Sequence, residues 1–98
     1  MYAYRATWIV KQGCMRKAVE LLKAETARAK SAKGKYRIYT PDISPNVLVW
    51  EDAWESVEEH DKFWDDYNAS PESDAFYGKL NELVERWTGT ERWILTEL

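Results

Sequence analysis

The chain has 98 residues, a single cysteine, six Trp and six Tyr, and a net charge of −3. Its length is typical of one domain over 1–98, its lone Cys14 excludes an internal disulfide, and no apolar run could cross a membrane, so we expect a cytoplasmic protein. Residues 1–40 carry +8 and residues 41–98 carry −11 by direct count, which favours two helices of opposite charge lying near each other over a surface for an anionic partner. Nucleic-acid binding is not expected, because the acidic half would repel phosphates.

The first two predicted elements are a strand over 2–10 and a helix over 15–32. Aromatic and β-branched residues dominate 2–10, which is typical of a strand, and Gly13 follows as a break. Gly34 comes just after the predicted helix, where a left-handed glycine commonly ends one. The helix is predicted from apolar side chains that recur at the helical period, namely Met15, Ala18, Val19, Leu22, Thr26 and Ala29.

Two further strands are predicted over 35–40 and 47–52. Between them, Pro, Asp, Ser and Asn cluster over 41–46, and this composition is typical of a loop. In 47–52, apolar side chains fall on both faces of the strand. A sheet with one face in water would alternate apolar and polar residues, so this strand is expected to be covered on both faces.

A second helical segment is predicted to begin at Ser56 and to restart at Ser70. The run Ser56-Val57-Glu58-Glu59 is a capping box, and its helix is expected to reach Tyr67. Ser70-Pro71 then offers a new cap followed by a proline at the first helical position. Gly89 is expected to close the restarted helix before a last strand over 92–98. The apolar stripe of that helix is Phe76, Leu80, Leu83, Val84 and Trp87.

The predicted order is strand, helix, strand, strand, broken helix, strand. This order is that of the α+β ferredoxin-like fold, βαββαβ, in which right-handed crossovers place the helices on one face of an antiparallel sheet. The other face would then be bare, although the strands carry apolar or aromatic groups on both faces. A second copy of the chain is the simplest cover, so we expect a homodimer.

Two stretches carry a resemblance to a known group. Trp50-Glu51-Asp52-Ala53-Trp54-Glu55-Ser56 leads into His60, and Asn68-Ala69-Ser70-Pro71 precedes Phe76. With the element order, these resemble the dimeric α/β-barrel superfamily, and within it NIPSNAP-like and antibiotic-biosynthesis-monooxygenase-like domains. The resemblance covers nearly the whole chain and implies a homodimer with a cavity between the helices and the sheet of each protomer.

The same superfamily includes cofactor-free monooxygenases, haem-degrading enzymes and isomerases, so the resemblance does not select one reaction. Its haem-degrading members carry an Asn on the first strand, and residues 2–10 contain none. We therefore expect no cofactor. A metal site is not expected either, because His60 has no acid three or four residues away on its helix, and the nearby acids suit a solvated helix face.

His60, the only histidine, is the candidate catalytic residue. At helical spacing it shares a face with Val57, Trp64 and Tyr67, which should point toward the sheet. An imidazole there could act as a general base, as a haem ligand or as a donor to a ligand, whereas the structural alternative is a core-edge histidine bonded to a backbone carbonyl. Trp54 and Trp64, which flank His60 in sequence, are the predicted aromatic walls of a ligand pocket.

Arg5, Arg37 and Tyr39 complete the predicted ligand-binding residues. Both arginines lie mid-strand, and each is costly in a sheet covered on both faces unless it is paired or wet. They could bind an anionic group in the cavity. Alternatively, each could form an ion pair with an acid from another strand, either Glu51, Asp52 or Glu97.

Two function classes follow from these residues. The first is a domain that binds a small apolar or aromatic molecule in the cavity without catalysis. The second is a cofactor-independent monooxygenase that acts on an electron-rich aromatic, with His60 or a tyrosine assisting proton removal. Polar groups that converge on one cavity would favour the enzyme.

Overall fold

The structure is a computed structural model that describes residues 1–29, 34–43 and 46–96. Three predictions extend outside these residues: the end of the first helix at 30–32, part of the loop at 44–45, and the last two residues of the final strand. The elements in chain order are β1 (Tyr2–Val10), α1 (Met15–Ala29), β2 (Lys35–Tyr39), β3 (Val47–Trp54), α2 (Val57–Asn68), α3 (Pro71–Leu83) and β4 (Val84–Ile94).

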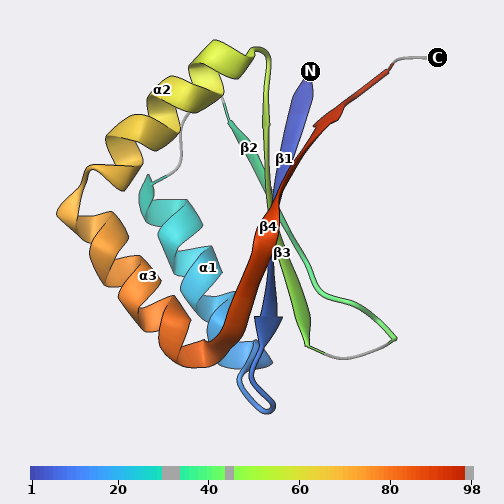
Figure 1. Cartoon of the computed structure of the whole chain (residues 1–98), viewed down its shortest axis with the longest axis vertical. Coiled ribbons are helices and arrows are strands. Elements are labelled where there is room, and N and C mark those ends of the chain that lie inside the picture. The colour runs from blue at the N-terminus through green and yellow to red at the C-terminus, as the bar shows by residue number, and fades with distance from the viewer. Residues whose placement is uncertain (30–33, 44–45, 97–98) are drawn as a thin grey trace.

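The four strands form one antiparallel sheet in the order β2-β3-β1-β4. All three helices cover the same face of this sheet (Figure 1). This confirms the predicted ferredoxin-like order and the predicted break in the second helical segment. The other face of the sheet carries no helix in Figure 1.

The predicted end of the last helix is wrong. We expected the helix to continue to Gly89, but α3 ends at Leu83 and β4 begins at Val84. Val84 pairs with Val10, so β4 matches the whole length of β1. Val84 and Trp87 continue a helical stripe by their spacing, but in the structure they pair with Val10 and Trp8 of β1, which satisfies their backbone groups in the sheet.

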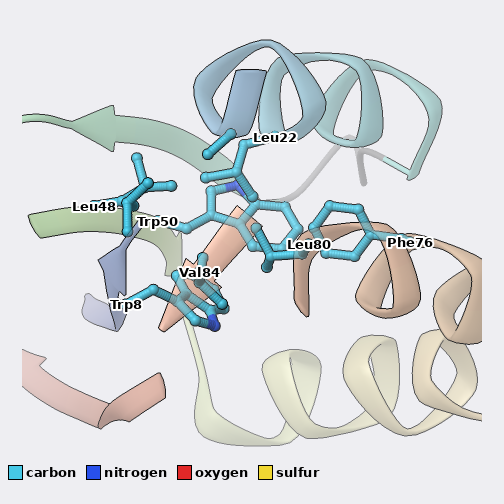
Figure 2. Packing of buried hydrophobic residues seen from close by; sticks show 9 residues of the cluster. Trp8, Leu22, Leu48, Trp50, Phe76, Leu80 and Val84 are labelled. Carbon is cyan, nitrogen blue, oxygen red and sulfur yellow. The ribbon is translucent and has the colours of Figure 1, made fainter. Parts of the chain in front are cut away.

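The main core lies between the sheet and helices α1 and α3, and Trp50 occupies its middle (Figure 2). The Trp50 ring centroid lies 5.5 Å from that of Phe76 and 6.4 Å from that of Trp8. Its indole N–H donates to the Thr26 hydroxyl at 3.0 Å, so burial leaves no unpaired donor. Leu22, Leu48 and Leu80 are fully buried around it.

Both predicted helix caps of the second segment are present. The Ser56 hydroxyl accepts a hydrogen bond from the Glu59 N–H at 3.2 Å, and the Ser70 hydroxyl accepts one from the Ser73 N–H at 3.3 Å. Pro71 occupies the start of α3, where it removes no helical hydrogen bond. The first of these caps fixes the rotation of α2 and therefore the direction in which His60 points.

Gly34 is needed for space and not for a left-handed cap, which corrects the prediction. The positive-φ residues among those described are Gly13, Gly89 and Asn46. A Cβ on Gly34 would lie 2.8 Å from the Trp54 ring and 3.0 Å from the Tyr36 hydroxyl. Trp54 is buried, so the indole has little room to move away.

We expect Gly34→Ala to lower the free energy of unfolding by about 1–3 kcal/mol, because the new methyl group overpacks the buried Trp54 indole. Gly78→Ala is the matched control: Gly78 lies within α3 with open space around its Cβ position. That control should gain roughly 0.5–1 kcal/mol from helix propensity. Urea unfolding followed by far-ultraviolet circular dichroism measures both, and equal stability of the two variants would contradict the account.

Candidate functional site

A cavity of about 450 Å³ opens between the sheet and helices α2 and α3. Its inner wall is buried and includes Trp8, Trp50 and Asp52. Its solvent side is formed by exposed residues, among them Asn68 and Trp87. The full lining is Ala6, Trp8, Trp50, Asp52, His60, Trp64, Asn68, Tyr77, Asn81, Trp87 and Thr90.

Asp52 is the charged group of the inner wall. Side chains alternate along β3, so Asp52 shares the helix-facing side of the sheet with Trp50 and Trp54. Only 7 % of its surface is exposed. Its Oδ2 accepts a hydrogen bond from the Trp64 indole N–H at 2.7 Å and another from the Trp54 indole N–H. The carboxyl group is therefore held by two neutral donors within an aromatic layer.

Burial is the main cause that raises the pKa of Asp52 above its ordinary value. The hydrogen bonds from Trp64 and Trp54 and the proximity of His60 all favour the carboxylate and oppose this rise, but burial outweighs them. Asp52 is thus a carboxyl group whose charge the fold compensates only in part.

His60 reaches the cavity from the first turn of α2. Its ring stacks on Tyr4, with centroids 3.4 Å apart and planes 5° apart, which fixes the imidazole against β1. Nδ1 lies 2.9 Å from the Asp61 carboxylate, and Nε2 lies 3.9 Å from Oδ2 of Asp52. When Nδ1 carries the proton toward Asp61, Nε2 keeps a free lone pair on the side of Asp52.

Tyr77 of α3 brings a phenol to the cavity, and a second buried carboxylate lies behind it. Burial, followed by the negative charges of Glu25 and Asp52, raises the pKa of Tyr77. Glu25 is ion-paired with Arg28 at 2.7 Å and accepts a hydrogen bond from the Tyr67 hydroxyl. The bond from Arg28 is the main cause that lowers the pKa of Glu25, so this carboxylate stays ionised.

The structure separates the predicted site residues into two groups. His60 and Trp64 line the cavity, and Trp54 contacts it through Asp52. By strand alternation, Arg5, Arg37 and Tyr39 lie on the opposite face of the sheet and do not line this cavity. These three side chains are therefore separated from His60 by the sheet.

The residues on the opposite face form a polar cluster around Glu51. Arg5 Nε pairs with Glu51 at 2.8 Å, and the Tyr39 hydroxyl donates to the same carboxylate at 3.0 Å. Arg5 also lies over the rings of Tyr39 and Trp93, at 5.4 and 5.8 Å from their centroids. For Arg5, the structure shows the ion-pair alternative.

The sequence interpretation missed Asp52, Tyr77 and the amides of Asn68 and Asn81 as cavity residues. A signal for Asp52 was present, because it stands between Trp50 and Trp54 on the apolar side of a strand. For Asn68, the signal is its place at helical spacing after His60 and Trp64. Tyr77 and Asn81 are likewise four residues apart on α3, so both face one side.

Two further features bear on the chemistry of this site. Within 1–29, 34–43 and 46–96, no three His, Cys, Asp or Glu side chains gather as metal ligands would. Over the same residues, no helix has the length and apolar character needed to cross a membrane. The side chains that line the cavity bring aromatic rings, a carboxyl group, an imidazole, a phenol, a hydroxyl and amides.

The raised pKa of Asp52 predicts a pH-dependent effect of Asp52→Asn on stability. Asp52 ionises near 3.8 in the unfolded chain and at higher pH in the folded chain. As pH rises through this interval, the unfolded state loses its proton first, so folding becomes less favourable. We expect Asp52→Asn to melt higher than the parent at neutral pH, by a margin that vanishes below pH 3.8.

Thermal melts of the two proteins from acid to neutral pH measure this margin. The control is Asp66→Asn, which removes the same charge from an exposed position of α2. A margin for Asp52→Asn that grows toward acid pH would contradict the burial argument, because it would mean that the native state favours the carboxylate.

Comparison with known proteins supplies the fold and no activity. No protein-family model matches the chain, and no curated protein matches it in sequence. The chain is similar in structure to an uncharacterised NIPSNAP domain protein from Burkholderia xenovorans, with a TM-score of 0.81 and 14 % identity over 98 % of this chain and 95 % of that one.

Two other solved structures extend the likeness. A NIPSNAP family protein of unknown function from Agrobacterium tumefaciens has a TM-score of 0.76 and 22 % identity, over 97 % of this chain and 86 % of that one. A putative antibiotic biosynthesis monooxygenase from Chloroflexus aurantiacus has a TM-score of 0.69 and 12 % identity, over 98 % of this chain and 93 % of that one. The chain therefore has the fold of NIPSNAP and antibiotic-biosynthesis-monooxygenase-like domains, which confirms the resemblance.

Proposed function

We propose that this protein is a homodimer that binds a small planar aromatic molecule in the cavity between sheet and helices. The observation that carries the proposal is the composition of the cavity: indole rings form much of its wall, and a few polar groups converge on its interior. Ligand sites in proteins are mostly apolar and aromatic, with a small number of placed polar groups that orient the ligand.

Size and ring geometry support a flat ligand. The volume of about 450 Å³ lies within the range of small-molecule sites, roughly 300–1,000 Å³. Trp50 and Trp64 meet almost at right angles, with planes 83° apart and centroids 5.6 Å apart. A planar molecule can stack on one of these rings while it meets the edge of the other.

A second candidate function is a cofactor-independent monooxygenase that acts on an electron-rich aromatic. The specific observation in its favour is His60, whose Nε2 lies beside Asp52 at the cavity while Nδ1 is engaged by Asp61. Such an imidazole can accept a proton from a bound substrate. The similarity to a putative antibiotic biosynthesis monooxygenase is in fold alone and supports this candidate only as an analogy.

The sheet face without helices in Figure 1 supports the proposed homodimer. Apolar side chains of β1 and β3, including Ile9 and Val49, point to that face and are only half-buried. Trp93 of β4 is 51 % exposed. The same face carries both signs of charge, with Arg5 and Arg37 opposite Glu51 in the strand register. A second copy offers a matching apolar surface and complementary charges, which is what a two-fold interface needs.

Ligand binding is tested with thermal melts of the parent and of His60→Ala, with and without planar aromatic compounds such as naphthalene derivatives. We expect the ligands to raise the parent's melting temperature, because they bind only the folded state. His60→Ala should lose most of this shift and little of its own stability. Trp93→Phe, on the opposite face of the sheet, is the control and should keep the shift.

Two results separate the alternatives. No shift for any compound, together with strong destabilisation by His60→Ala, would make His60 structural and would overturn the binding proposal. Oxygen consumption with a ligand and no added cofactor, lost in His60→Ala, would favour the monooxygenase.

The dimer is tested by sedimentation of the purified protein at micromolar concentration. We expect twice the monomer mass of 11.6 kDa for the parent. Val49→Lys should shift the population toward monomer, because a charge on the open sheet face must be desolvated in the interface. Gln12→Lys adds the same charge in an exposed turn and should leave the dimer intact. A well-folded parent that sediments as a monomer would contradict the proposal.

A further inference from the structure

The cavity contains a buried acid and no side chain of fixed positive charge. Among its lining residues, all of which belong to the described part of the chain, Asp52 is the one carboxyl group, and none is Lys or Arg. His60 is the one lining group that can become cationic, and its Nε2 is 3.9 Å from Asp52, beyond hydrogen-bond distance. The inner wall therefore carries a net negative charge when Asp52 is ionised and His60 is neutral.

The fold offers Asp52 only partial compensation. Its two hydrogen bonds come from the neutral indoles of Trp54 and Trp64. The other buried carboxylate near the cavity, Glu25, is ion-paired with Arg28 and so needs no further cation. A buried carboxylate is stabilised most by a cation in direct contact, and His60, the one lining residue that can carry positive charge, stays 3.9 Å from Asp52.

The walls of the cavity also favour a positive charge. The face of an indole ring carries negative electrostatic potential and attracts cations within about 6 Å, an effect that grows when the site excludes water. Four tryptophans contribute to the lining, and the phenol of Tyr77 adds a fifth aromatic group. The tryptophans that line the cavity are Trp8, Trp50, Trp64 and Trp87.

We propose that the ligand of this cavity is an arylalkyl amine, a flat aromatic ring that carries an aliphatic amine in its ammonium form, with the charged nitrogen beside the Asp52 carboxylate and the ring among the tryptophans. This inference rests on the proposed binding function and narrows its ligand class. The ammonium group donates to Asp52 and supplies the positive charge that the inner wall lacks. The exposed amides of Asn68 and Asn81 lie at the solvent side, where polar substituents of the ligand would meet them.

Anionic aromatics should be rejected by the same geometry. A carboxylate or phenolate placed in the cavity would bring a second negative charge next to the buried Asp52 carboxyl group, and the two like charges would repel each other. A neutral aromatic of the same shape would gain the ring contacts but not the charge pairing. The expected order of affinity is therefore cation, then neutral molecule, then anion.

The experiment compares three compounds of matched shape: naphthylmethylamine, naphthylmethanol and naphthoate. Each is titrated into the 98-residue protein at neutral pH, and binding is followed by calorimetry. We expect the amine to bind at least about tenfold more tightly than the alcohol, since a buried charge-assisted hydrogen bond and cation–π contacts act together. Naphthoate should bind more weakly than the alcohol.

Asp52→Asn identifies the group responsible. The amide keeps the size of the side chain and an acceptor for the indoles, so it should reduce the affinity for the amine to near that for the alcohol, while the alcohol changes by less than about threefold. The matched control Asp66→Asn removes a charge from an exposed position of α2 and should leave both affinities unchanged.

The outcomes distinguish a failure of the amine inference from a failure of the proposed aromatic-binding function. If none of the three compounds binds the parent, the proposed aromatic-binding function itself fails. If the alcohol or the carboxylate binds as tightly as the amine, the binding function stands and the amine inference is overturned. If Asp52→Asn is poorly folded, the order of the three compounds on the parent protein still decides the matter.

Discussion

The carboxyl group of Asp52 accepts two indole N–H bonds inside a layer of apolar side chains, and the arrangement of the cavity depends on this constraint. A carboxyl group placed there without donors would cost several kcal/mol, so its position requires both tryptophans to turn their indole nitrogens inward. Trp54 is held in turn by the close approach of Gly34, and Trp64 by the rotation of α2 that the Ser56 cap sets. Residues of β3, of α2 and of the segment before β2 thus act together to position the buried Asp52 carboxyl group.

Because side chains alternate along each strand, the two faces of the sheet carry different residues. On the helix side, β3 presents Trp50 and Asp52 to the cavity. On the other side it presents Glu51, which forms an ion pair with Arg5 and accepts a hydrogen bond from the Tyr39 hydroxyl. Asp52 has no such complement and faces an open volume. This difference between two adjacent acids is the reason for assigning ligand binding to one face and subunit contact to the other.

The element order and both caps could be predicted because they depend on local signals, such as the capping box at Ser56 and the proline after Ser70. The end of α3 could not, since Val84 and Trp87 continue a helical stripe and only pairing with β1 makes them strand. His60 and Trp64 lie at the cavity, as their helical phase predicts, and their role as site residues stays a prediction. Arg5 and Arg37 lie on the opposite face of the sheet, and polarity in a strand does not reveal which face of the sheet borders a cavity. Asp52 of β3 and Tyr77 of α3 line the same cavity only because of tertiary packing, which the sequence pattern does not show.

The central claim is that the ligand enters the indole-lined cavity and contacts Asp52. The most direct measurement is a nuclear magnetic resonance titration of the indole N–H signals of an isotope-labelled sample with naphthylmethylamine. The Trp64 and Trp54 signals, whose protons are bonded to Asp52, should shift with one saturating binding curve, while the signal of Trp93 on the opposite face should stay in place. A shift confined to Trp93, or none at the two Asp52-bonded indoles, would contradict the account.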